Sequence, residues 1–440
     1  MIFNALHVSL NLNKVIGGLV LDFYGMWAAR CFSAVFVTLG LTLMCFTYTA
    51  PANVWLVWAG LFFYVGYGTS ISFLNLNFTN MYPNIQGLLI SLIAGSVGTS
   101  QFLYTIVKRL IENETGFEFW MFWAILLCCT PFIWIRTFLW SPCYMIPKNV
   151  PDHYEIGWKS RKQTEFKLNQ KRERSNTIES IKSGAKSMKS INALKMIFSV
   201  PNCLIYVWFL FMDIRLTSFS SQYQTWLRWV VVGVDGNITA EAENTISQWT
   251  DTLNIVNLSG VVTGPLLGLL LVDLPRRLVL KRRNDVKFAT LTATTFSMII
   301  VTLCSIGLSF LACVQSPIEI HWLTIIFDFI IRAMLYVVRN MMLIILNPDE
   351  FFGRVMGIAN AVAIVTGFLM PPFSELIRGP FGGNFVIFEV IFGVIMTVLL
   401  AVPGYFVWYL KSGSFTSNGL KNGDNFNRLE DEVKDEVKNE

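Results

Sequence analysis

The chain has 440 residues, of which 54% are hydrophobic and only 14% are charged, and its formal net charge at pH 7 is +5. Ordinary soluble domains carry roughly a quarter of charged residues, and the mean hydropathy here is +0.52. Such a chain cannot cover a globule with polar surface, so the expected solvent is lipid, and no nucleic-acid partner is expected. The 8 cysteines lie within or beside apolar runs without a CxxC pair, so neither a metal site nor a disulfide framework nor a cofactor is indicated.

Apolar runs long enough to cross a membrane follow one another along most of the chain. A bilayer core needs about 20 apolar residues per helix, and such runs predict about eleven spans. Charges interrupt two of them, at Arg215 and at Arg332. The expected ranges are 3–21, 31–49, 54–78, 87–109, 117–139, 202–222, 251–273, 287–312, 320–346, 354–377 and 384–410.

Lysine and arginine mark one side of the predicted membrane protein. The short segment 274–287 is basic, and so is the long segment 141–200. The opposite loops contain Asn113-Glu114-Thr115 and Asn237-Ile238-Thr239, which predict glycosylation at Asn113 and Asn237. The positive-inside rule therefore places 141–200, 274–287 and the tail 411–440 in the cytoplasm, and the plasma membrane is the expected location.

The predicted spans divide into two groups. Residues 1–140 and 201–410 are expected to form an N-terminal and a C-terminal half bundle, joined by the basic cytoplasmic loop 141–200. Within this loop apolar residues recur near helical spacing with lysines opposite, as in an interfacial helix, but a disordered linker fits the composition equally. The polar tail 411–440 is expected to be disordered.

A pattern of glycine, aspartate and arginine occurs twice, each time at the expected cytoplasmic end of a span. The first copy contains Gly18, Asp22, Gly25 and Arg30, and the second contains Gly268, Asp273 and Arg276. Small residues allow close helix packing in lipid, and the Asp and Arg residues could clamp neighbouring helices and so gate one of two states. The alternative is that they are ordinary juxtamembrane charges.

The two copies indicate duplicated halves, because they recur about 250 residues apart in corresponding positions. One predicted span, 202–222, lies between the central loop and the second copy, whereas no predicted span precedes the first copy. By symmetry, the first half is therefore expected to begin at the second span of the repeat, with its first span missing.

Three short stretches are more specific: Asp213-Ile214-Arg215-Leu216, Arg332-Ala333-Met334-Leu335-Tyr336 and the segment from Asn347 to Gly357. Together with the segment from Gly18 to Arg30, they resemble solute carrier family 43 of the major facilitator superfamily. The resemblance implies an all-α integral membrane fold of two pseudo-symmetric helical bundles, with alternating access to a central site. It also implies facilitative transport of large neutral amino acids or equilibrative transport of nucleobases.

Some positions depart from the pattern of the family. Phe23 stands where an arginine is usual, Asn347 stands where a phenylalanine is expected, and Gly98-Thr99-Ser100-Gln101 replaces a more serine-rich run. These departures leave the identity of the substrate open.

Ionisable residues deep within a span are costly in lipid and are expected to face a cavity or a partner. Arg332 is the sharpest candidate for substrate binding, although Asp328, one helical turn earlier, could simply pair with it. Arg215 could bind a substrate carboxylate or brace the two halves, and Arg339 is expected to snorkel or to belong to the gate. Neutral polar candidates, each of which could equally be an interhelical hydrogen bond, are Asn75, Thr99, Ser100, Gln101 and Asn257.

The leading hypothesis is a facilitative uniporter of a small neutral organic solute, with a large neutral amino acid as the first expectation. Uniport is favoured because Asp328 is the only carboxylate expected deep in a span, with Glu375 and Glu389 toward the external ends. A nucleobase carrier is the alternative of the same class, and a truncated, non-transporting membrane protein is the alternative of another class. A membrane enzyme is disfavoured because no nucleophile-base or metal constellation is visible.

Overall fold

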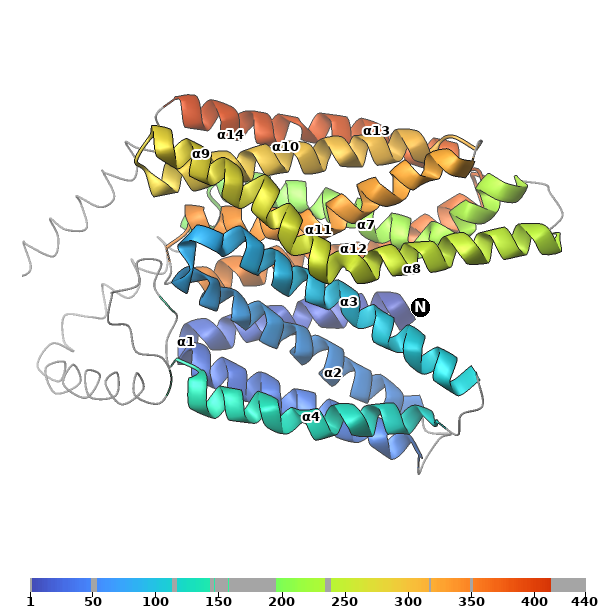
Figure 1. Cartoon of the computed structure of the whole chain (residues 1–440), viewed down its shortest axis with the longest axis horizontal. Coiled ribbons are helices and arrows are strands. Elements are labelled where there is room, and N and C mark those ends of the chain that lie inside the picture. Colours follow the sequence, from blue (N-terminus) through green and yellow to red (C-terminus); the bar gives the residue numbers. More distant parts are fainter. Residues whose placement is uncertain are drawn as a thin grey trace, which may run out of the picture.

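The computed structural model describes residues 2–48, 54–112, 117–142, 146, 157, 195–233, 239–315, 318–348 and 351–412, and every regular element in these ranges is a helix (Figure 1). Most of the central loop, the tail after residue 412, and both predicted glycosylation sites, Asn113 and Asn237, lie outside the described residues. Helices are the expected solution in lipid, because they satisfy every backbone hydrogen bond within one segment.

The first half contains α1 (Ile2–Cys45), α2 (Val54–Asn75), α3 (Gln86–Glu112) and α4 (Phe119–Trp140), with the short helices η1 (Phe46–Tyr48), η2 (Leu76–Met81) and η3 (Pro83–Ile85) between them. The 44 residues of α1 would measure about 66 Å as a straight helix, roughly twice the thickness of a bilayer core. The chain reverses at Gly25, where φ is 86° and ψ is 177°, a conformation that favours glycine. Helix α1 therefore supplies two antiparallel spans (Figure 1).

The second half contains α7 (Val200–Val232), α8 (Ala240–Gly268), the π-helical turn η4 (Leu269–Asp273), α9 (Leu274–Arg282), α10 (Val286–Ala312), η5 (Ile318–Ile320), α11 (His321–Leu346), α12 (Phe352–Arg378), α13 (Phe385–Leu399) and α14 (Ala401–Lys411). Helices α8, η4 and α9 run on from one another, and α13 and α14 together form one long apolar stretch, Phe385–Lys411.

The predicted fold class is confirmed. Within the described ranges, 9 helical stretches are long and apolar enough to cross a membrane. One of them is α1, which covers two predicted spans, and α3 coincides with the predicted span 87–109. Each predicted span thus corresponds to a helical segment.

Several predicted boundaries were wrong. Helix α7 continues to Val232 rather than ending near 222, because its added turns bury Tyr223, Trp226 and Trp229, which interleaved polar residues conceal in a hydropathy scan. Helix α8 begins at Ala240, ahead of the apolar run, and Thr239 caps it by accepting a hydrogen bond from the Ala242 backbone N–H. The basic segment predicted as a loop is helical as far as Arg282.

The halves meet mainly along two pairs of helices, and α3 also contacts α11. Helix α1 packs along α12, and α3 packs along α8, so that each pair joins one helix from each half. Helix α7 lies against α8, α11, α12 and α13 and ties the second half together, whereas α3 has few contacts with α2 or α4. No described helix of the first half takes the place that α7 has in the second.

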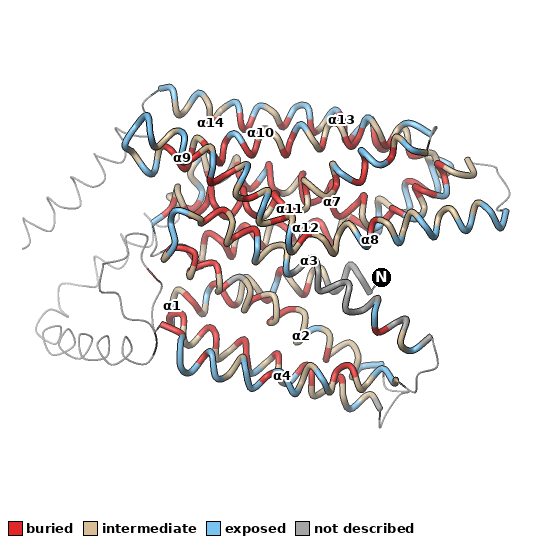
Figure 2. Tube along the Cα trace, viewed as in Figure 1, coloured by how far each residue is buried: buried red, intermediate tan, exposed pale blue. Residues whose placement is uncertain are grey.

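Burial follows this arrangement (Figure 2). The main core runs through α7, α10, α11 and α12, and a smaller core forms between α1, α2, α3 and α4 around Met44, Tyr67 and Trp123. Large apolar side chains cover the outer faces: Phe132 is 73% exposed, and Phe310 and Val398 are each 68% exposed. An apolar outer surface over a packed interior suits a bundle that is solvated by lipid.

Candidate functional site

Asp22 connects the first half to the second at the end of the molecule that is predicted to face the cytoplasm. It lies in α1 just before the reversal, and its carboxylate accepts hydrogen bonds from the backbone N–H groups of Gly353 and Arg354, each at 2.8 Å. The Arg354 guanidinium lies 3.5 Å from the same carboxylate. Because α12 begins at Phe352, Asp22 caps the free N–H groups and the positive dipole end of that helix.

Asp273 makes the equivalent contact in the opposite direction. It ends η4 in the second half, and its carboxylate accepts hydrogen bonds from the backbone N–H groups of Gly87 at 3.0 Å and Leu88 at 2.8 Å, in the first turn of α3. Arg276 extends the contact by donating to the carbonyl oxygen of Pro83. We call these two contacts, Asp22 on α12 and Asp273 on α3, the reciprocal caps.

Glycine residues allow the capped helices to approach. A Cβ atom on Gly18 would lie 2.5 Å from the Gly353 carbonyl oxygen, and one on Gly268 would lie 2.6 Å from the Gly87 carbonyl oxygen. Neither position has room for a larger side chain without a backbone shift. The two copies of the sequence pattern therefore place glycine and aspartate in corresponding positions of two corresponding interfaces.

Gly25 and Arg30, which are also predicted to gate, make their contacts within the first half. Gly25 forms the reversal in α1. Arg30 is buried, donates a hydrogen bond to the Asn75 side-chain oxygen and lies 4.9 Å over the Phe78 ring. Asn75, predicted to bind substrate, is therefore engaged by Arg30 at the end of α2.

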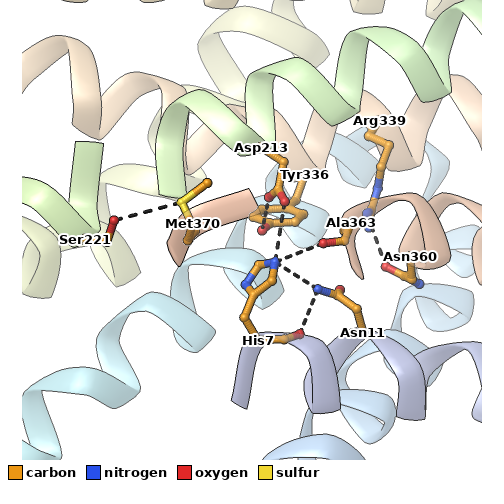
Figure 3. Close-up of polar contacts among 9 residues, drawn as sticks. All are labelled: His7, Asn11, Asp213, Ser221, Tyr336, Arg339, Asn360, Ala363 and Met370. Carbon is orange, nitrogen blue, oxygen red and sulfur yellow. Dashed lines mark hydrogen bonds and ion pairs between the residues drawn. The ribbon is translucent and has the colours of Figure 1, made fainter. Parts of the chain in front are cut away.

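A second set of contacts between the halves lies deeper in the molecule (Figure 3). The His7 Nε2 atom, on α1, is 3.6 Å from the Asp213 Oδ2 atom on α7 and 3.2 Å from the Ala363 carbonyl oxygen on α12. The Asn11 side-chain nitrogen lies 3.1 Å from the His7 ring and donates to the His7 carbonyl oxygen at 3.1 Å.

Asp213 and Arg339 continue this set within the second half. The Tyr336 hydroxyl donates to Asp213 Oδ1 at 3.0 Å. Arg339 is buried and donates to the Asn340 side-chain oxygen at 2.9 and 3.0 Å and to that of Asn360 at 3.2 Å. The expectation that Arg339 snorkels was therefore wrong, because amide oxygens hold its guanidinium inside the protein. We call the following residues the midplane cluster: His7, Asn11, Asp213, Tyr336, Arg339 and Asn360.

The midplane cluster lies between the two halves, near the middle of the helices that carry it. Asp213, Tyr336 and Ala363 fall in the middle thirds of α7, α11 and α12. Substrate sites of transporters built from two repeats lie near the bilayer midplane, at the interface between the repeats. The cluster combines a carboxylate, a guanidinium, an imidazole, a phenol and two amides, which together can donate and accept several hydrogen bonds.

Arg332 lies on the same helix one turn before Tyr336. Its guanidinium is 3.0 Å from the Asp328 carboxylate and donates to the Ser220 hydroxyl on α7 at 2.7 Å. Its side chain remains 23% exposed, whereas that of Asp328 is fully buried. The structure thus shows the intrahelical ion pair that the sequence suggested, and it leaves part of Arg332 accessible.

Arg215, which the sequence offered either as a substrate ligand or as a brace, is enclosed within the second half. Its guanidinium is fully buried, pairs with Glu389 on α13 at 2.6 Å and donates to the Ser309 hydroxyl on α10 at 3.1 Å. Residues two apart on a helix point in nearly opposite directions, so Asp213 faces the other half while Arg215 faces inward. This geometry favours bracing, and within the second half rather than between the halves.

The expectation that Asp328 is the only carboxylate deep in a span was also wrong. Glu389 and Asp213 are both buried, Glu389 with 2% and Asp213 with none of its surface exposed, so Asp328 is not the only carboxylate inside the bundle. Asn257, in the middle of α8, has a buried side-chain oxygen without a hydrogen-bond partner among the described residues. Thr99, Ser100 and Gln101 lie on α3, and their side chains are outside the described part of the chain.

Sequence reasoning missed most of the midplane cluster, although spacing contained a signal. His7, Asn11, Gly18 and Asp22 fall on one face of α1, at successive separations of four, seven and four residues. On α11, Asp328, Arg332, Tyr336 and Arg339 fall on one face in the same way. A polar stripe along an otherwise apolar span indicates a face turned toward protein rather than lipid.

The helices have the fold of the major facilitator superfamily, as solved structures of transporters show. The structure is similar to that of the fucose:proton symporter of E. coli, with a TM-score of 0.55, 11% sequence identity and coverage of 91% of this chain and 89% of the symporter. It is also similar to a proton:xylose symporter, with a TM-score of 0.54, 13% identity and coverage of 90% and 84% of the two chains.

Sequence comparison supports the predicted resemblance more specifically. The chain is 24% identical over 391 residues to equilibrative nucleobase transporter 1 of Bos taurus, covering 86% of this chain and 77% of that protein. No family model matches the chain. The resemblance inferred from the short motifs is thus confirmed, and the chain is an integral membrane protein whose relatives are transporters.

Proposed function

We propose that the chain is a facilitative, alternating-access transporter of a small neutral organic solute. The observation that carries the proposal is the midplane cluster, a buried polar site between the two halves. The reciprocal caps lie at one end of the same interface and join the halves there. Rocking of the halves around such a site exposes it to each side of the membrane in turn.

Two solute classes fit this site. The similarity to a bovine nucleobase transporter supports a nucleobase, which can accept and donate hydrogen bonds along its edges. A large neutral amino acid is the other candidate, because Arg339 and Asp213 offer charges of both signs. The bilayer is the solvent in both cases, and the plasma membrane is the proposed location.

Uptake of labelled adenine, hypoxanthine and leucine by transport-deficient cells that express the chain tests the proposal. We expect saturable uptake of one solute class that stops when inside and outside concentrations are equal, and that accelerates when the cells are preloaded with the unlabelled solute. Accumulation above the external concentration would contradict the facilitative mechanism. Absence of uptake by a chain that reaches the cell surface would favour the non-transporting alternative.

A further inference from the structure

Lys14 occupies a position on α1 between the two levels at which the halves touch. Residues 7, 11, 14, 18 and 22 share one face of this helix. At one end of the face His7 contacts the second half, and at the other end Gly18 and Asp22 do so. Lys14 is therefore turned toward the second half, and it lies within electrostatic reach of Asp213 and Arg339.

The charges around Lys14 do not balance. Lys14 and Arg339 share a single carboxylate, that of Asp213. Arg339 rests on neutral partners, the Asn340 and Asn360 side-chain oxygens and the Phe209 ring, whose centre is 4.3 Å away. The Lys14 side chain makes neither a hydrogen bond nor an ion pair with any residue that the structure describes.

Among the described residues, no group near Lys14 supplies the missing negative charge. The Asp328 carboxylate is already paired with Arg332 at 3.0 Å. One Asp213 oxygen accepts from Tyr336, and the other lies 3.6 Å from the His7 ring, which can only add positive charge.

We propose that Lys14, together with Arg339, binds the electron-rich oxygen of the transported solute, the ring carbonyl of an oxo-nucleobase or the carboxylate of an amino acid. This inference rests on the proposed function and adds a specificity-determining residue to it. Lys14 is half-buried, and an ammonium group at such a place binds an oxygen acceptor more strongly than one in bulk water, because less water competes for it. A solute that presents an amino group at the same place meets two cations instead and binds less well.

Paired substrates test the proposal. Hypoxanthine and adenine differ in having an oxo or an amino group on the same ring carbon, and leucine and leucinol differ in the carboxylate. In the Lys14→Met variant we expect the KM for hypoxanthine or leucine to rise by about tenfold or more. The KM for adenine or leucinol should change by less than about threefold. The pair of substrates whose KM values diverge in the variant shows whether the bound oxygen belongs to a nucleobase carbonyl or to an amino-acid carboxylate.

Two further variants control for folding. Lys14→Arg keeps the charge and should restore most of the discrimination between the paired substrates. Lys281→Met removes an exposed lysine on α9 and should leave both KM values unchanged. If Lys14→Met does not reach the membrane, Lys14→Gln replaces it, and solute binding to each purified variant is measured by thermal shift. Equal changes in KM for both members of each pair, or no change in either, would overturn the proposal.

The inference and the proposed function can fail separately. A wild-type chain that transports one class of solute without favouring its oxygen-bearing member refutes only the role of Lys14. If the purified wild-type chain binds hypoxanthine or leucine, Lys14→Met weakens this binding, and the wild-type chain does not transport the solute, only the proposed function is refuted. A purified chain that binds none of the four solutes refutes both.

Discussion

Arg215 and Arg332, two arginines of the second half, show how environment separates a structural residue from a candidate functional one. Arg215 and Glu389 are both enclosed, and their side chains meet at 2.6 Å. Arg332 also has a carboxylate partner, but 23% of its side chain is exposed. A fully enclosed ion pair has no site left for a solute, whereas a partly exposed guanidinium keeps donors available.

For the enclosed pair, we expect Arg215→Leu to destabilise the protein by about 3–5 kcal/mol, since Glu389 is left buried without its counter-charge. The loss should appear as a lower melting temperature of the purified protein and less protein at the cell surface. Adding Glu389→Leu to the same chain should recover most of the stability, because a buried ion pair can be replaced by packed apolar residues. A double variant as unstable as the single one would contradict this account.

For the partly exposed arginine, Arg332→Gln should abolish uptake per molecule at the cell surface, with some loss of stability because Asp328 is left buried without its counter-charge. The change removes the charge that is offered to the solute and keeps a side chain able to bond with Ser220. Arg228→Gln, at an exposed position of α7, is the matched control and should transport normally. Unchanged uptake by the Arg332 variant would place this residue outside the transport path.

At the scale of elements, the reciprocal caps determine which helix ends meet. Each cap joins an aspartate of one half to the first N–H groups of a helix in the other, and each is accompanied by a pair of glycine residues in close contact. Because the caps lie at one end of the interface, they stabilise the state in which that end is closed.

We expect Asp22→Ala and Asp273→Ala to open that end to similar extents, because the contacts are equivalent. Loss of a helix cap costs about 1 kcal/mol, which corresponds to roughly a fivefold shift in the equilibrium between the two states. The readout is maleimide labelling of a cysteine introduced at Ser91, which is buried between α3 and α8. Labelling should rise in both variants and further in the double variant, and Asp→Asn changes, which keep an acceptor oxygen, should have smaller effects. Unchanged labelling would show that other contacts hold the interface closed.

At the scale of the whole molecule, topology follows from the distribution of charge and of glycosylation motifs. Asn113 and Asn237 are expected on the outside, and segment 274–287 on the inside. Digestion with an endoglycosidase should increase the electrophoretic mobility of the wild-type chain. Asn113→Gln and Asn237→Gln should each remove part of this shift, and the double variant should show no shift. A protease that reaches segment 274–287 from outside intact cells would contradict this orientation.

The sequence by itself determined the class of fold and the order of the helical segments, and it predicted that Asp22 and Asp273 lie where neighbouring helices meet. These features follow from local properties. A bilayer requires about 20 apolar residues for each crossing, and a duplicated pattern repeats at a fixed place in each half. The predicted helix ends differed from the observed ones where aromatic residues are interleaved with polar ones, as at the end of α7.

Only the tertiary structure decided what each polar residue faces. Asp213 and Arg215 lie two positions apart in one motif, yet one meets His7 of the other half and the other meets Glu389. Burial and pairing depend on helices that are hundreds of residues apart in the chain, so neither spacing nor composition could assign them. The same holds for Lys14, whose role depends on the balance of charges that three packed helices bring together.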